Sequence, residues 1–210
     1  MSDKFGLIAE SLIAGNVDEV TKLTKECLEE AGPDDVLQKG LLAGMEVVGQ
    51  RFKVGDMFIP EVMRCAKAMR GAMDILRPKL IESDIPTAGT FVIGTVKGDL
   101  HDIGKNLVLM MYEGAGFRTV NLGVDLDTEV FVNAVKEEKP DILGMSALLT
   151  TTMPRMGEVI NALKEAGIRD QVKIIVGGAP VTSDYAEQIG ADAYGANAAM
   201  AVDVGKSLLG

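Results

Sequence analysis

A single histidine, His101, stands in a loop bounded by Gly98 and Gly104, and Asp99 precedes it by two positions. Imidazole is a common ligand of transition metals. A carboxylate that binds the other ring nitrogen fixes the tautomer of such a ligand and raises its basicity. The flanking glycines allow tight turns and the close approach of a bulky group. The spacing therefore fits a metal-binding histidine with a supporting carboxylate.

The rest of the chain does not complete an ordinary metal site. Such sites use three or four protein ligands, commonly His and Cys. Here His101 is the only histidine. The two cysteines, Cys27 and Cys65, lie in predicted helices far from His101 in the sequence. A metal already held by a macrocycle needs only an axial ligand from the protein. One histidine is enough for that role.

Two other interpretations of the loop stay open at this point. The first is a polar connection from a strand to a helix, in which His101 caps the helix or faces solvent. The second is a phosphate-binding loop, suggested by Gly98, Gly104 and Lys105. The glycine spacing matches neither a Walker A sequence nor a G-x-G-x-x-G turn.

The composition excludes some classes of binding partner and indicates a cellular compartment. The 210 residues carry a formal net charge of −10, which argues against nucleic acid and against an anionic membrane surface. No apolar run reaches the roughly 18–20 residues that span a bilayer, and the first residues lack a secretory pattern. Two cysteines suit a reducing compartment. We expect a cytoplasmic protein.

Residues 1–88 are predicted to form a helical domain and a linker. Apolar residues recur at helical spacing up to about residue 82, which predicts a bundle of four helices with short connections. Asn16 is placed to cap the second helix, and Pro33 stands near the start of the third. The fourth runs from about residue 60 to 80, and residues 82–89 form a short polar linker.

Residues 89–210 are predicted to form an α/β domain. Apolar runs indicate strands at residues 90–96, 118–123, 141–147, 172–176 and 191–194. Helical stretches lie near residues 104–115, 127–138, 153–167, 182–189 and 197–209. This alternation predicts a flavodoxin-like (Rossmann-type), doubly wound, five-stranded parallel sheet. Such sheets bind ligands at the switch point beyond the strand ends, here the loops 97–104 and 147–152.

Three short motifs then stand at predicted strand ends: Asp99-x-His101-x-x-Gly104, Ser146-x-Leu148 and Gly177-Gly178. Together they resemble the signature of cobalamin-binding domains in which a histidine replaces the cofactor's own lower base on cobalt. The resemblance implies that His101 is the cobalt ligand and that Asp99 orients its ring.

The resemblance also implies a binding site for cobalamin or a related corrinoid, with the nucleotide tail between the strand ends. The implied residues are Gly98, Asp99, Leu100, His101, Asp102, Ile103, Gly104, Ser146, Leu148, Thr150, Thr151, Thr152, Gly177, Gly178, Ala179, Tyr194 and Gly195. In cobalamin-dependent methionine synthase a serine completes the Asp–His relay, and Thr152 stands at the matching position. A threonine hydroxyl can make the same hydrogen bond.

The stretch 44–62 resembles the helical cap before the cobalamin domain of methionine synthase. It also resembles the small corrinoid proteins of methanol, methylamine and methoxy-aromatic methyltransferase systems. The resemblance implies that Phe58 and its neighbours cover the upper corrin face. The alternative is that Phe58, Met63 and Met69 are plain bundle core.

The function implied by both resemblances is that of a methyl carrier without a catalytic site for the methyl donor. A substrate-specific methyltransferase delivers a methyl group to Co(I), and a second corrinoid-dependent methyltransferase passes it to a thiol or a tetrahydropterin. Two alternatives share the His101 loop: a subunit of an adenosylcobalamin mutase, and a cobalamin-based sensor. The first lacks this cap, and the second adds a basic DNA-binding segment.

Overall fold

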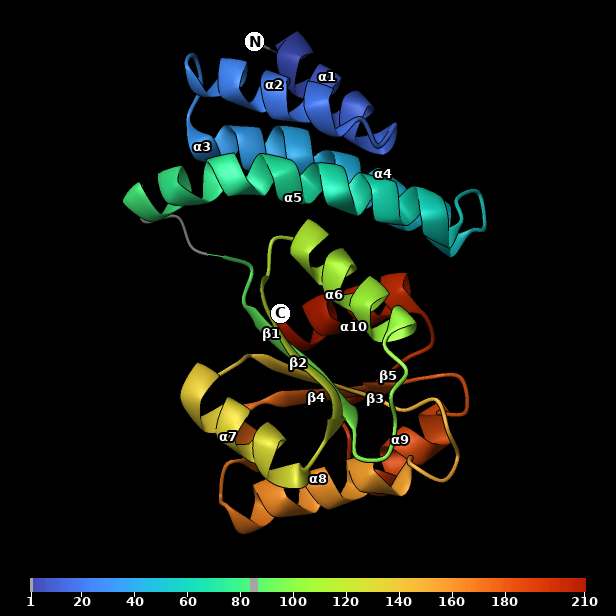
Figure 1. Ribbon diagram of the computed structural model, residues 1–210. Coiled ribbons are helices and arrows are strands. Elements are labelled where there is room, and N and C mark those ends of the chain that lie inside the picture. The colour runs from blue at the N-terminus through green and yellow to red at the C-terminus, as the bar shows by residue number, and fades with distance from the viewer. Residues whose placement is uncertain (1, 84–86) are drawn as a thin grey trace. The chain divides into compact units, whose positions relative to one another are not determined.

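The computed structural model describes residues 2–83 and 87–210, so residues 84–86 of the predicted linker lie outside the described part. The chain divides into two compact units (Figure 1). The helical unit comprises Met1–Ala88 with Glu113–Gly116, and the α/β unit comprises Gly89–Tyr112 with Phe117–Gly210.

The helical unit is built from α1 (Ser2–Ile13), α2 (Val17–Leu28), α4 (Ala43–Lys53) and α5 (Ile59–Glu82). The predicted cap is confirmed, since the side chain of Asn16 accepts a hydrogen bond from the Glu19 N–H at 3.2 Å. Such a bond satisfies a backbone donor that the first turn of the helix leaves free.

The predicted third helix is present but is not α-helical throughout. Short α3 (Pro33–Asp35) is followed by a π-helical segment, Val36–Leu42, which continues directly into α4. The segment packs closely on α1, because a Cβ added at Gly40 would lie 3.0 Å from Ile8 Cγ2. Small residues here permit a contact that side chains would prevent.

The bundle core accounts for one of the three apolar residues considered above. Met69 is buried, whereas Phe58 is 67% exposed and Met63 is 46% exposed. The core interpretation is therefore correct for Met69 and wrong for Phe58 and Met63.

The α/β unit contains a five-stranded sheet in the order β2-β1-β3-β4-β5, with every pair parallel. The strands are β1 (Thr90–Val96), β2 (Arg118–Leu126), β3 (Ile142–Ser146), β4 (Lys173–Gly177) and β5 (Ala193–Gly195). This order confirms the predicted flavodoxin-like fold, whose switch point lies between β1 and β3.

Helices cover both faces of this sheet. They are α6 (Ile103–Gly114), α7 (Thr128–Glu138), α8 (Pro154–Glu165), α9 (Ser183–Ile189) and α10 (Ala198–Leu209), with an unpredicted 3-10 turn at Arg169–Gln171. In Figure 1, α6 and α10 lie on one face, and α7, α8 and α9 lie on the other.

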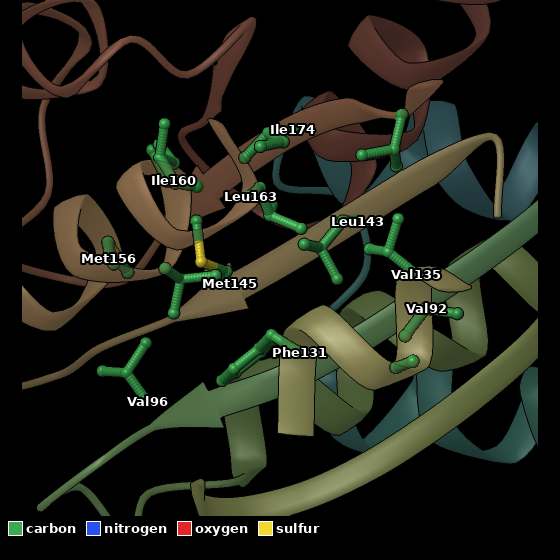
Figure 2. Packing of buried hydrophobic residues seen from close by; sticks show 14 of the residues in the cluster. Val92, Val96, Phe131, Val135, Leu143, Met145, Met156, Ile160, Leu163 and Ile174 are labelled. Atoms are coloured by element: carbon green, nitrogen blue, oxygen red, sulfur yellow. The ribbon is translucent and has the colours of Figure 1, made fainter. Parts of the chain in front are cut away.

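The core beneath α7 and α8 is mainly aliphatic, in line with the low aromatic content of the chain. Figure 2 shows Val92, Leu143 and Ile174 of the central strands together with Phe131 of α7 and Ile160 of α8. Burying a side chain of this size contributes about 1.5–3 kcal/mol. This packing holds the strand ends, and the loops that follow them, in place.

Strand β2 departs from the prediction. It runs three residues further than the expected end at residue 123, and its side chains are only partly buried because it is an edge strand. Its register with β1 shifts around Gly94, where an added Cβ would lie 2.5 Å from Leu126 Cδ1. The shift carries the end of β2 alongside the loop that follows β1.

The ends of β3 and β4 approach so closely that Gly178 tolerates no side chain. Its φ is +135°, and an added Cβ would lie 1.8 Å from the carbonyl oxygen of Ala147. We expect Gly178→Ala to lower the free energy of unfolding of the apoprotein by at least about 2 kcal/mol, measured by urea denaturation followed by circular dichroism.

Gly157→Ala in α8 is the matched control, since its Cβ would meet Ile189 Cγ2 at an ordinary 3.6 Å. This change should be neutral or stabilise the protein by up to about 1 kcal/mol. Equal effects of both substitutions would contradict the steric argument.

Candidate corrinoid site

The predicted carboxylate–histidine pair is present in the structure. Asp99 Oδ1 lies 2.7 Å from His101 Nδ1 and accepts the backbone N–H of His101 at 3.1 Å. The Asp99 side chain is fully buried, whereas the His101 side chain is 52% exposed. The imidazole therefore lies at the surface, and the carboxylate that binds it is buried.

The other oxygen of Asp99 is bound by the loop after β3. Asp99 Oδ2 accepts the backbone N–H groups of Leu148 at 2.7 Å and Leu149 at 3.2 Å, and the Thr152 hydroxyl at 2.9 Å. The hydroxyl oxygen also lies 2.9 Å from the carbonyl oxygen of Leu149. Its single hydrogen serves one of the two acceptors at a time.

These contacts determine the charge of Asp99. Burial by itself raises the pKa of this carboxyl, but the hydrogen bonds from His101, Leu148 and Thr152 outweigh it and hold the pKa well below its usual range. Asp99 is thus ionised at neutral pH and only accepts hydrogen bonds. Nδ1 of His101 must then carry the hydrogen, which leaves the lone pair of Nε2 for a metal.

Large apolar side chains surround the histidine. Leu100 and Ile103 are 72% and 74% exposed, and Leu148 and Leu149 from the second loop are also exposed. Exposed aliphatic side chains thus flank the histidine in both loops. No side chain occupies the space beside Gly104, where an added Cβ would meet nothing within 4 Å.

The predicted tail-binding glycines have a packing reason of their own. A Cβ at Gly177 would lie 3.0 Å from the carbonyl oxygen of Gly195, and one at Gly195 would lie 2.8 Å from Ala201 Cβ. These glycines let backbones approach one another, a requirement that exists before any ligand binds. Their role in a tail slot remains a prediction.

The other predicted site residues fall at the same edge of the sheet, with one exception. Ser146 pairs in register with Gly177, and Tyr194 stands one residue before the end of β5. Thr150 and Thr151 are exposed in the turn before Thr152. Asp102 accepts a hydrogen bond from Asn106 at 3.0 Å, and Ala179 follows Gly178. The exception is Phe58, which belongs to the helical unit.

Asp125 was not predicted as part of the site, and Lys97 and Leu149 were predicted only as members of the loops 97–104 and 147–152, without a role. Leu149 contributes a backbone N–H, which no residue type reveals. The Asp125 carboxylate accepts the Gly98 N–H at 2.8 Å, and Lys97 forms ion pairs with Asp125 and Asp127. The positive φ of Asp125, 54°, leaves no clear signal in the sequence.

Lys105 does not support the phosphate-loop interpretation. The residue is buried, and its Nζ donates to the side-chain oxygens of Asn106 and Asn121, both at 2.7 Å. Its ammonium group is thus bound by amides at the edge of the sheet. Lys105 therefore does not offer its positive charge to a phosphate group in the loop that contains His101.

Within residues 2–83 and 87–210, no three His, Cys, Asp or Glu side chains gather as a metal site. Over the same residues, no helix is both long and apolar enough to cross a bilayer.

Both units match families described as B12-binding domains, over residues 89–203 and 7–77. Trimethylamine corrinoid protein 1 of Methanosarcina acetivorans is 44% identical, with 95% of this chain and 98% of that protein covered. Dimethylamine corrinoid protein 3 of the same organism is 41% identical over the full length of both chains.

Two solved structures of cobalamin proteins are also similar to this chain. A cobalamin-binding protein from Desulfitobacterium hafniense has a TM-score of 0.81 at 32% identity, with 98% of each chain covered. The methanol:cobalamin methyltransferase complex MtaBC of Methanosarcina barkeri gives 0.88 at 33% identity, with 99% of this chain and 80% of that chain covered.

The fold and the site thus define a B12-binding protein with a helical domain before its sheet. The chain belongs to the family of methyltransferase corrinoid proteins. The corrinoid cofactor predicted from the histidine loop is thereby confirmed.

Thr152→Val should test how much the buried hydroxyl contributes to holding Asp99. The variant keeps the shape of the side chain and removes one hydrogen bond to a buried carboxylate. We expect the free energy of unfolding to fall by about 1.5–3 kcal/mol, measured by urea denaturation of the apoprotein. Thr152→Ser keeps the hydroxyl and should lose less; a valine variant as stable as the wild type would refute the argument.

Proposed function

We propose that this chain carries methyl groups between two methyltransferases on a corrinoid whose cobalt is bound from below by Nε2 of His101. The observation that carries the proposal is the contact between the buried Asp99 carboxylate and Nδ1 of the half-exposed His101 ring, which leaves Nε2 for a metal. When bound, the corrinoid supplies a cobalt atom that accepts a methyl group and releases it.

The residues present fit this cofactor. Leu100, Ile103, Leu148 and Leu149 offer an apolar surface beside the imidazole, which suits a large, flat macrocycle. Gly104 adds no side chain that would obstruct it. The glycines at the ends of β4 and β5 lie where the nucleotide tail is proposed to run.

The protein's own contribution is to hold and orient the ligand. Asp99 and Thr152 link the imidazole to the interior and supply a short path along which a proton reaches or leaves the pair. A stronger hydrogen bond from Nδ1 to Asp99 makes Nε2 a better electron-pair donor to a metal. Phe58 and its neighbours in the helical unit are proposed to shield the opposite corrin face from water.

A methyltransferase partner is supported by the similarity to the methanol:cobalamin methyltransferase complex. The trimethylamine and dimethylamine corrinoid proteins are 44% and 41% identical to this chain, compared with 33% for the matched chain of the methanol complex, so we propose a methylamine methyltransferase as the donor enzyme. A second corrinoid-dependent methyltransferase, acting on a thiol or a tetrahydropterin, is proposed as the acceptor enzyme. Both would meet this chain in the cytoplasm.

His101 can be tested directly because it is the only histidine in the chain. Labelling with [¹⁵N]histidine in an untagged protein places the isotope at one site. After reconstitution with cobalamin and reduction to Co(II), the electron paramagnetic resonance spectrum should show the nitrogen coupling change from three lines to two. His101→Ala should lose that coupling. Coupling that does not respond to the label would exclude His101 as the ligand.

Methyl transfer is tested separately from ligation. The holoprotein, reduced with titanium(III) and given [¹³C]methyl iodide, should take up one methyl group per cobalt, measured by ¹³C nuclear magnetic resonance. Failure to take up the methyl group would contradict the carrier function while leaving the ligand assignment intact.

A further inference from the structure

The loop that contains His101 is held from a second side, by the end of β2. Asp125 Oδ1 accepts the backbone N–H of Gly98 at 2.8 Å, and the backbone N–H of Asp125 donates to the carbonyl oxygen of Asp99 at 2.9 Å. One residue thus accepts a bond on one side of Asp99 and donates one on the other. Asp99 is also tied to β1 through its own N–H and the carbonyl oxygen of Val96.

This contact requires an unusual backbone. Asp125 has a φ of 54°, and Lys139 is the other non-glycine residue with positive φ in the described part of the chain. Such a conformation is uncommon outside glycine, although Asp and Asn adopt it more readily than most. Strained conformations persist where the surrounding structure requires them, often at functional sites. Here the conformation aims both polar groups of Asp125 at one segment.

The path of β2 brings Asp125 to this position. Strand β2 continues to Leu126, beyond its predicted end at residue 123. The register shifts around Gly94 and the positive φ of Gly123, 100°, accompany this extension. Asp125 is also ionised, because the Gly98 N–H and then Lys97 hold the pKa of its carboxyl below the usual value. Its ion pair with Lys97 is largely exposed and contributes little by itself.

We propose that Asp125 is a positioning residue for the cobalt ligand: by clamping the backbone on both sides of Asp99, it sets the direction in which the Asp99 carboxylate holds the His101 ring. The geometry of a ligand depends on the groups behind it, and errors well below 1 Å there affect the site. This inference rests on the proposed function only in naming cobalt as the target of His101.

Four proteins separate the contributions of Asp125. Asp125→Gly favours the positive φ and keeps the backbone N–H but removes the side-chain acceptor, so it should fold. Asp125→Asn keeps an acceptor oxygen and tolerates the same backbone conformation. Asp127→Asn is the matched control, because Asp127 also pairs with Lys97, at 3.2 Å, but makes no bond to Gly98. Wild type is the reference.

The first measurement uses the [¹⁵N]histidine-labelled full-length apoprotein, in which the ring nitrogens of His101 give the only labelled signals. Wild type, Asp125→Asn and Asp127→Asn should show a single tautomer with hydrogen on Nδ1. Asp125→Gly should shift both ring nitrogens toward the tautomer mixture of free histidine. The second measurement is cobalamin affinity, which should weaken roughly fivefold in Asp125→Gly, the effect of losing one hydrogen bond, and stay near wild type in the other two.

Unchanged ring signals in Asp125→Gly would overturn the inference, because the Asp99–His101 pair would then not depend on the clamp. Equal changes in Asp125→Gly and Asp127→Asn would overturn it too, since the effect would then follow charge near Lys97. The ring signals are read without cobalt. A wild-type Co(II) spectrum that lacks histidine coupling would therefore reject the proposed function and leave this result standing.

Discussion

The site depends on one buried carboxylate. Asp99 is enclosed, yet it is ionised because five N–H or O–H groups surround its two oxygens. An isolated carboxylate at such depth would take up a proton. The same hydrogen bonds that keep it charged also join the loop after β1 to the loop after β3. Charge, loop packing and the orientation of His101 are consequences of one arrangement.

That arrangement exists because of the sheet order. In β2-β1-β3-β4-β5 the chain reverses direction across the sheet between β1 and β3, so the loops leaving these two strands turn toward opposite faces and open a crevice. Asp99 bridges the loops at this point. The edge strand β2, lengthened by its register shift, supports the first loop from the other side through Asp125.

Several strands of the sheet and the Asp99–His101 pair could be predicted from the sequence. Buried parallel strands are continuous apolar runs, so β1, β3 and β4 were located to within one or two residues. The lone histidine with Asp99 two positions earlier predicted the pair that the structure contains. Long-range details were less accessible. The π-helical segment and the extension of β2 depend on close approach between elements, which local periodicity does not encode.

Apolar periodicity in the sequence is enough to predict the fold class. The corrinoid cofactor and a histidine ligand are implied by the resemblance of three strand-end motifs to cobalamin-binding domains. Only the tertiary structure shows how His101, the proposed ligand, is held. Leu149 acts through a backbone N–H, and Asp125 acts through a positive φ and a register shift. Such contacts join segments 26 to 50 residues apart through main-chain atoms that every residue has, so residue types do not reveal them.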